Sequence, residues 1–197
     1  MRKLKERGEN MEKSKWKVLK SEDVSPSKWF PIIKDEVELP NGKVIEYYTS
    51  QLPAVAMVVA ITKENELIFV RQYKHGIGEM CIEFPAGRIE DGHTPEEAAI
   101  AELSEETGIR VDADCIVKLV ELWTEPSKSS VRVTGFFVKD VTITQNQQLE
   151  ESEDIEVLKV PLVKLNSFIL ENEIHASDTL ALLLFARMKF PEEFCAD

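Results

Sequence analysis

The chain has 197 residues, of which 43% are hydrophobic and 30% are charged, and its formal net charge is -12. This composition is typical of a globular protein with one well-buried domain and room for a smaller appendage. The negative charge argues against binding to nucleic acid or to an anionic membrane surface, and an anionic phosphate ligand would need a bridging cation.

The cysteines indicate a reducing compartment. There are three of them, widely spaced and without a C-x-x-C pair: Cys81, Cys115 and Cys195. This pattern predicts no disulfide framework. The longest apolar run, near residues 53–61, is too short to span a membrane. We therefore expect a cytoplasmic protein.

The N-terminus is expected to be a flexible leader over residues 1–15. It is rich in charged residues and lacks the apolar core of a signal peptide. Either Met1 or Met11 is the true start of the chain in this interpretation.

Residues 16–52 are predicted to form a small β-rich appendage to a main domain at residues 53–197. Two extended runs, 32–39 and 43–49, flank an Asn-Gly pair, and Asn-Gly between such runs is a strong hairpin signal. An isolated hairpin is only marginally stable in water. Another surface should therefore cover this unit.

The main domain opens with two predicted strands, 54–61 and 66–73, separated by a polar turn. Residues 79–87 are expected to form one further strand, which ends in a Pro-Ala-Gly turn. Beyond residue 108 the pattern predicts strands at 115–123 and 131–141, an acidic loop at 146–154 and a last strand at 155–162. Two helices follow, at 162–172 and 178–189, and Ser177 is the expected cap of the second. The lack of a regular alternation favours an α/β fold with a mixed sheet between helices over a doubly wound parallel sheet.

The clearest helix is predicted at residues 95–107. Thr94 is a suitable N-cap, Pro95 occupies the first helical position, and Glu97 completes a capping box. Gly108 is a suitable C-cap.

Three carboxylates share one polar face of this helix, because Glu102 lies three residues before Glu105 and four before Glu106. Their mutual repulsion disfavours the helix by roughly 0.2–0.5 kcal/mol per pair, and no cation lies four residues further on. The face is either a solvated acidic surface or a site for a hard divalent cation. The preceding glycines would allow the Ala86 carbonyl to point at such an ion. The apolar residues point to the core on the opposite side: Ala99, Ile100 and Leu103.

Residues 87–109 resemble the Nudix box, G-x5-E-x7-R-E-U-x-E-E-x-G-U, in which U is a bulky aliphatic residue. Three stretches resemble the ADP-ribose pyrophosphatase-like branch of that family: the lead-in RQYKHGIGEMCIEFPAG, Pro126 and the acidic segment EESEDIEV. The resemblance covers about residues 30–190. It implies a Nudix-type α/β/α sandwich that hydrolyses a nucleoside diphosphate linked to another moiety, with Mg²⁺ or Mn²⁺. The expected substrate is ADP-ribose or a nucleoside diphosphate sugar. Seven positions of the box match with the right spacing: Gly87, Glu102, Leu103, Glu105, Glu106, Gly108 and Ile109.

The resemblance also implies roles for single residues at the metal. Glu102 and Glu106 match metal ligands, and the Ala86 carbonyl matches a backbone ligand. Glu105 matches a ligand or its support, and both Glu105 and Glu106 are catalytic candidates. Glu153 in the acidic loop matches a residue that binds metal or activates water.

At the substrate, the resemblance implies a contact from Arg71, and Glu83 and Trp29 are further candidates for substrate binding. Trp29 belongs to a group of aromatic residues in the appendage, which either form a stacking surface or contribute to a small core. The same branch of the family uses its N-terminal strands across a homodimer to complete the substrate site. We therefore expect a homodimer.

Two letters of the box depart from the pattern, since His93 replaces a glutamate and Ala101 replaces an arginine. His93 is an inert loop residue, a hydrogen-bonding support in place of the glutamate, or a ligand or base. Two functions remain open. The first is a Nudix pyrophosphatase that works at a normal or a slow rate, and the second is a Nudix-fold module that binds a nucleotide or a partner without turnover.

Overall fold

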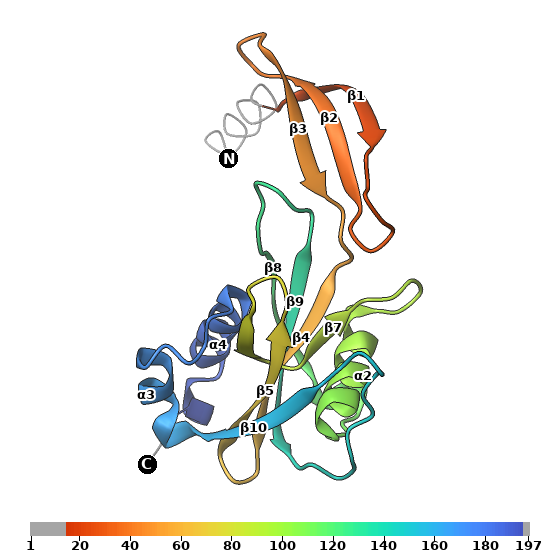
Figure 1. Cartoon of the computed structure of the whole chain (residues 1–197). Coiled ribbons are helices and arrows are strands. Elements are labelled where there is room, and N and C mark those ends of the chain that lie inside the picture. The colour runs from red at the N-terminus through yellow and green to blue at the C-terminus, as the bar shows by residue number, and fades with distance from the viewer. Residues whose placement is uncertain (1–14, 195–197) are drawn as a thin grey trace. The chain divides into compact units, whose positions relative to one another are not determined.

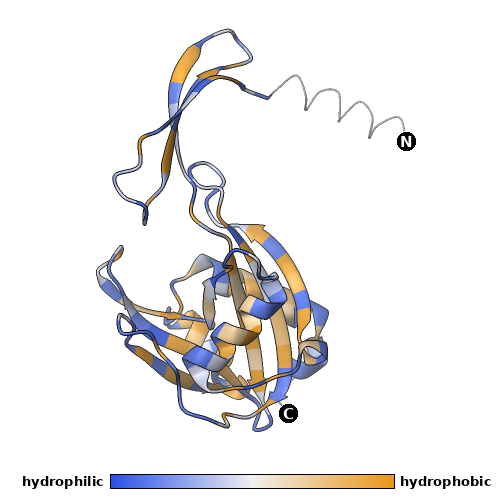
Figure 2. Ribbon diagram, turned by 90° about the vertical axis from the view of Figure 1, so that its right-hand side faces the viewer, coloured by the Kyte–Doolittle hydropathy of each residue, from blue (hydrophilic) through white to orange (hydrophobic). Residues whose placement is uncertain are grey.

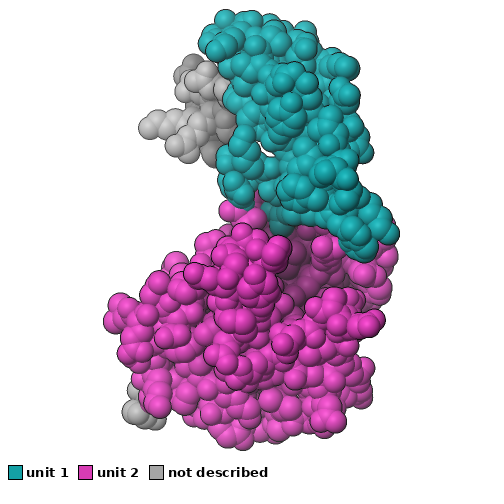
Figure 3. Space-filling model, viewed as in Figure 1, with its two compact units in different colours: residues 1–52, 125–131 teal, residues 53–124, 132–197 magenta. Residues whose placement is uncertain are grey.

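The computed structural model describes residues 15–194, and the chain divides into two compact units (Figures 1 and 3). The smaller unit consists of the segment that ends at Leu52 together with Glu125–Val131. The larger unit consists of Pro53–Thr124 and the segment that begins at Arg132. The leader expected at residues 1–15 lies, except for its last residue, outside the described part of the chain, as does Cys195.

The smaller unit is a three-stranded antiparallel sheet in the order β1-β2-β3. Strands β2 (Ile32–Glu38) and β3 (Val44–Ser50) form the predicted hairpin, which is confirmed. Strand β1 (Lys17–Asp23) was not predicted, because its sequence KVLKSED is fully exposed and lacks the alternation of a half-buried strand. Among the described hydrophobic side chains of this unit, Val37 alone is buried.

The loop Glu125–Val131 belongs to the smaller unit although it lies far from it in the sequence. The Ser50 N–H donates to the Lys128 carbonyl at 2.8 Å, and the Ser130 N–H donates back to the Ser50 carbonyl at 3.2 Å. The Tyr47 hydroxyl donates to the Ser127 carbonyl. The appendage is therefore built from two segments and not from residues 16–52 alone.

The larger unit contains a mixed sheet in the order β10-β5-β4-β9-β8, with β6 on β5 and β7 on β4. Strands β4 and β9 are parallel, and the other neighbours are antiparallel. The seven strands in this described unit are β4 (Val55–Thr62), β5 (Glu66–Lys74), β6 (Glu79–Glu83), β7 (Ala86–Arg88), β8 (Val117–Trp123), β9 (Arg132–Val141) and β10 (Ile155–Pro161).

Helices cover both faces of this sheet. Helix α2 (Pro95–Thr107) lies on one face, and α3 (Leu165–Leu170) and α4 (Ser177–Lys189) lie on the other (Figure 1). Short 3₁₀ turns occupy Ala113–Cys115, Leu162–Lys164 and Pro191–Phe194. The expected α/β/α sandwich with a mixed sheet is confirmed.

Strand β4 explains the two hydrophobic cores, because alternate side chains of a strand point to opposite faces. Ala56, Val58 and Ala60 pack toward α2, whereas Met57 and Val59 pack toward α3 and α4. Figure 2 shows mostly hydrophobic strands in the middle of the larger unit. No helix within residues 15–194 is long and apolar enough to cross a membrane.

Two local predictions were wrong. Residues 79–87 form two strands, not one, because the chain breaks at Pro85, whose carbonyl accepts the Val58 N–H at 3.0 Å, before β7 joins β4. The last helix begins at Ser177, so Ala176 is its N-cap and no side chain caps it.

Candidate active site

Helix α2 has the ends that its sequence predicts. Thr94 Oγ1 accepts the Glu97 N–H at 3.2 Å, and Glu97 Oε2 accepts the Thr94 N–H at 2.8 Å, which completes the capping box. Gly108 ends the helix with φ 74°, and its N–H donates to the Ser104 carbonyl at 2.9 Å. These caps fix where the helix begins and ends, and the buried residues Ala98, Ala99 and Leu103 pack its apolar side against the sheet.

The three acids of α2 lie in different environments. Glu105 is exposed and Glu102 is half-buried, but Glu106 is only 3% exposed. Glu106 therefore shares the acidic face with Glu102 but lies on its buried part and is not in solvent. Its Oε2 accepts the N–H of Ala86 at 2.9 Å, so strand β7 covers this carboxylate and orients it.

Gly87 lies directly against the carboxylate of Glu102. A Cβ at position 87 would stand 1.7 Å from Glu102 Oε1, which is far inside any contact distance. Since glycine alone lacks a Cβ, this residue makes room for the carboxylate. The first glycine of the box therefore has a physical role in the position of Glu102.

Glu102 and Glu106 hold their protons more tightly than an ordinary glutamate does. Burial, together with the charges of Glu102 and Glu83, raises the pKa of Glu106 to about 8, against the hydrogen bond from Ala86. Burial also raises the pKa of Glu102 to about 7, and the charges of Glu105 and other acids add to this effect.

The other acids that act on Glu102 are Glu153, Glu150 and Glu90. The structure thus brings the acidic loop and the turn before α2 to the same carboxylate. Glu153 was expected here, whereas Glu150 and Glu90 were missed. Glu150 lies three residues before Glu153 in the same acidic run, which was an available signal, but Glu90 occupies a position that the box leaves variable.

Glu83 lies at the end of β6 near the other buried carboxylate. Burial raises its pKa, and its charge in turn raises the pKa of Glu106. Gln72 Nε2 donates to Glu83 Oε1 at 3.0 Å, and Lys74 forms an ion pair with Glu83. Lys74 was not singled out from the sequence, although it is a cation whose charge lowers the pKa of Glu106.

Two further sequence candidates have their printed partners outside the acidic group. Arg71 on β5 is exposed and pairs with Glu156 on β10, with 3.0 Å between Nε and Oε2. Trp29 belongs to the smaller unit and is 66% exposed, with Lys28 Nζ 4.6 Å from its ring centroid. Trp29 is therefore not part of a hydrophobic core in this chain.

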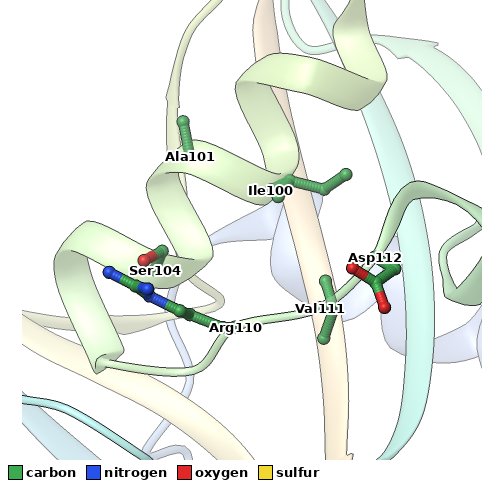
Figure 4. Close-up of a pocket in the computed structure, with 6 residues that line it drawn as sticks. All are labelled: Ile100, Ala101, Ser104, Arg110, Val111 and Asp112. Carbon is green, nitrogen blue, oxygen red and sulfur yellow. The ribbon is translucent and has the colours of Figure 1, made fainter.

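The two departures from the box lie on the outside of the molecule. His93 is exposed, and its N–H donates to the Glu90 carbonyl at 3.1 Å in the turn before α2. Ala101 is exposed and lines a pocket of about 550 Å³ beside the helix. Figure 4 shows the Arg110 side chain running back toward α2 near Ser104 in this pocket. The remaining lining residues are Ile100, Val111 and Asp112.

The donor set suits a hard divalent cation, because Glu102 and Glu106 offer carboxylate oxygens amid further negative charge. Within residues 15–194, no three His, Cys, Asp or Glu side chains already converge as a metal-ligand group. The carboxylates would therefore have to turn and lose their protons on binding. A bound cation would replace the protons and offset the burial, and also the repulsion, that raise the pKa values of Glu102 and Glu106.

A family model for the NUDIX domain matches residues 51–183, which is more than half of the chain. The protein belongs to the Nudix family. A second model, the nucleoside diphosphate sugar hydrolase N-terminal domain, matches residues 16–50 of this Nudix protein. The expected resemblance to Nudix hydrolases is confirmed.

Two curated relatives are equally similar to this Nudix protein over most of both chains. The ADP-ribose pyrophosphatase of Bacillus subtilis (strain 168) is 28% identical over 174 residues, which cover 88% of this chain and 93% of the relative. The methanol dehydrogenase activator of Bacillus methanolicus has the same identity and coverage. The crystal structure of an ADP compounds hydrolase superposes on this chain with a TM-score of 0.80 and 24% sequence identity. The superposition covers 91% of this chain and 96% of the other. That structure supports the fold.

Proposed function

We propose that this Nudix protein hydrolyses the pyrophosphate bond of ADP-ribose or of a related nucleoside diphosphate sugar, with the help of Mg²⁺ or Mn²⁺. The observation that carries the proposal is the pair Glu102 and Glu106, which lie side by side on α2, close to further acids and against Gly87 and the Ala86 N–H. The name of the Bacillus subtilis relative and the N-terminal family model support the substrate class.

Glu102, Glu106 and the Ala86 carbonyl would hold the metal. A divalent ion bound there would neutralise charge on the phosphate oxygens. The Ala86 N–H already fixes one oxygen of Glu106, so the other oxygen is free to face a ligand. Glu102, Glu106 and the Ala86 carbonyl are all retained, whereas the arginine of the Nudix box is replaced by Ala101.

Proton transfer would fall to the acids around Glu102. Attack of water on a pyrophosphate requires a base that orients the water and accepts its proton. Glu153 and Glu105 are the candidates, because the charges of both act on Glu102. Arg71 is a candidate for a phosphate contact, although it would first have to leave Glu156.

The test is release of phosphate from ADP-ribose in the presence of alkaline phosphatase, which attacks the phosphomonoester products but not the intact pyrophosphate. We expect turnover with millimolar Mg²⁺ or Mn²⁺ and none in excess EDTA. AMP and ribose phosphate should be identified by chromatography in a reaction without the phosphatase. No product from either ADP-ribose or ADP-glucose with both metals would refute the proposal.

A second candidate function is binding of a nucleotide or a partner without turnover. The open pocket at Ala101 favours it, because the arginine of the box is missing there, and one relative is named as an activator of another enzyme. Calorimetry distinguishes the two functions. Saturable binding of ADP-ribose with no product after prolonged incubation would support the binding module.

A further inference from the structure

The C-terminal end of α2 is tied to the segment that follows β9. The last carbonyls of a helix lack partners within the helix. Here the Glu105 carbonyl accepts the Gln148 N–H at 2.8 Å, and the Gly108 carbonyl accepts the N–H groups of Thr144 and Gln145 at 3.0 and 3.2 Å. The chain near residues 143–148 therefore runs along the end of the helix that carries Glu102 and Glu106.

Gln147 makes the most specific of these contacts. Its Nε2 donates to the Glu106 carbonyl at 2.7 Å and to the Ile155 carbonyl at 2.9 Å. An amide nitrogen has two hydrogens, so one group serves both carbonyls. Since both neighbours are acceptors, only the nitrogen of this amide can face them.

These two contacts close the acidic loop at both ends. Residues 148–154 begin directly after Gln147 and end directly before Ile155, which is buried at the start of β10. Within the loop, the Glu153 N–H donates to the Glu150 carbonyl at 3.0 Å, and the Glu150 N–H donates to Glu153 Oε2 at 2.9 Å. The loop is thus a short turn whose two ends meet at one side chain.

Gln147 also contacts the main chain of Glu106, the buried acid of α2. The main-chain carbonyl of Glu106 is held by Gln147, while its carboxylate is held by the Ala86 N–H. A single residue of the helix is therefore fixed to the acidic loop on one side and to β7 on the other. Movement at Gln147 would change the separation between the acids of the loop and those of the helix.

We propose that Gln147 is a positioning residue, which holds the acidic loop, with Glu150 and Glu153, against α2 at the carbonyl of Glu106. This role rests on the proposed hydrolysis at the same site. Gln147 acts through the carbonyls of Glu106 and Ile155 and does not itself touch the substrate. Closing a loop at its base restricts the conformations of its tip, which is why one side chain can fix two carboxylates.

The experiment compares Gln147→Met with Gln148→Met. Methionine keeps the length of the side chain and removes both donors. Gln148 is the matched control, because its side chain makes no hydrogen bond within residues 15–194 and its N–H is retained. We expect Gln147→Met to lower the turnover rate with ADP-ribose about tenfold, which corresponds to about 1.4 kcal/mol of barrier. Gln148→Met should stay within about twofold of the parent.

Two further readouts separate positioning from general stability. In the absence of substrate, Gln147→Met should weaken Mn²⁺ binding by about tenfold, measured by the electron paramagnetic resonance signal of the ion. This is the lower end of the roughly 10–100-fold loss typical when a group that holds a metal ligand is removed. Hydrogen exchange should accelerate at residues 148–154 but not in β4 or β9. All measurements are made well below the unfolding midpoint of each variant, so that the folded fraction does not limit the rate.

Equal effects of the two substitutions on Mn²⁺ binding and on exchange in the loop would overturn the role of Gln147. An inactive parent enzyme would instead refute the proposed hydrolysis, and the exchange and Mn²⁺ data would still test the positioning. Faster exchange throughout the larger unit would also overturn it, because Gln147 would then be a general stabilising contact.

Discussion

Glu106 combines two properties that seldom occur together, since it is buried and it belongs to the acidic face of the helix. Glutamine has the same shape and can still accept the Ala86 N–H, but it binds a hard cation poorly. We expect Glu106→Gln to lower turnover at saturating Mg²⁺ by at least about 100-fold. Even the mutation of a group that only holds a metal ligand typically lowers metal affinity or activity roughly 10–100-fold. Circular dichroism should be unchanged.

The control for Glu106→Gln is Glu64→Gln, which removes an exposed carboxylate in the turn between β4 and β5. It should leave turnover as in the parent. Full activity of Glu106→Gln at saturating metal would exclude this carboxylate as a ligand.

The raised pKa values predict how stability depends on pH in EDTA. The pKa of Glu106 is about 8 in the folded protein, against 4.5 for an ordinary glutamate. Between these values the folded state binds more protons than the unfolded state, so the free energy of unfolding falls as the pH rises. The contribution of Glu106 to the free energy of unfolding is fully present below pH 4.5 and is lost as the pH rises through about 8. Glu102, with a pKa of about 7, acts in the same direction.

Urea unfolding of the parent and of Glu106→Gln at several pH values measures this effect. The variant lacks the titrating group, so its stability relative to the parent should increase from pH 6 to pH 9, a range that spans about 7 and about 8. Parallel curves would contradict the burial of an ionisable Glu106. Added Mg²⁺ should stabilise the parent most at the alkaline end, because the ion competes with protons.

Gly87→Ala tests the contact with Glu102. The new Cβ would displace the far end of the Glu102 side chain and no backbone atom, so the fold should tolerate it. We expect the unfolding midpoint to stay within about 3 °C, which is roughly 1 kcal/mol for a chain of this size. Turnover should fall by about tenfold or more, because a carboxylate of the metal site is moved.

The matched control is Gly76→Ala, since a Cβ there would meet nothing within 4 Å. Its activity and its midpoint should equal those of the parent. If Gly87→Ala also behaved as the parent does, Glu102 would have no fixed position that matters for turnover.

At the scale of elements, α4 has an N-terminus that can be improved. Ala176 is the N-cap, with extended backbone at φ -73° and ψ 120°, and it offers no side-chain acceptor to the first turn. Ala176→Ser should stabilise the protein by about 1 kcal/mol. Thermal unfolding should show a rise of roughly 2–4 °C.

Ser177→Ala tests whether Ala176, as in the structure, or Ser177, as predicted from the sequence, is the N-cap of α4. Ser177 is the first helical residue, so its hydroxyl caps nothing and its removal should change the midpoint little. A loss of about 1 kcal/mol in Ser177→Ala, as expected for a true cap, would contradict the observed start of the helix.

At the scale of the whole molecule, the smaller unit predicts a homodimer. In its described part Val37 is the one buried hydrophobic residue, while a set of large apolar side chains is exposed: Trp16, Val18, Leu19, Val24, Trp29, Phe30, Val44 and Tyr48. A sheet of three short strands has little stability without a surface against it. A second copy of the chain is the surface that the family resemblance implies.

Light scattering at micromolar concentration should give twice the chain mass of 22.4 kDa. The mass should stay the same at high salt, because burial of apolar surface is not screened. A monomer mass at these concentrations would refute the prediction.

Local chemistry determined much of this protein from sequence alone. Asn41 and Gly42 specified the hairpin of β2 and β3, and Thr94 and Gly108 specified both ends of α2. Each of these signals acts within a few residues, through a turn conformation or a cap, and needs no distant partner. The spacing of the acids on α2 likewise followed from helical geometry and led to the Nudix family.

Tertiary structure decided what depends on segments far apart in the chain. Glu106 is buried because β7 returns over α2, and Gln147 matters because the acidic loop closes against the same helix. Glu83 reaches the site only through the pairing of β5 and β6, and Glu125–Val131 joins the smaller unit by contacts with Ser50. Helical and strand periodicity report which face a side chain occupies, but they do not report what the fold places against that face. That is the physical reason why the acids could be found in the sequence while their burial, their pKa values and their positioning contacts required the structure.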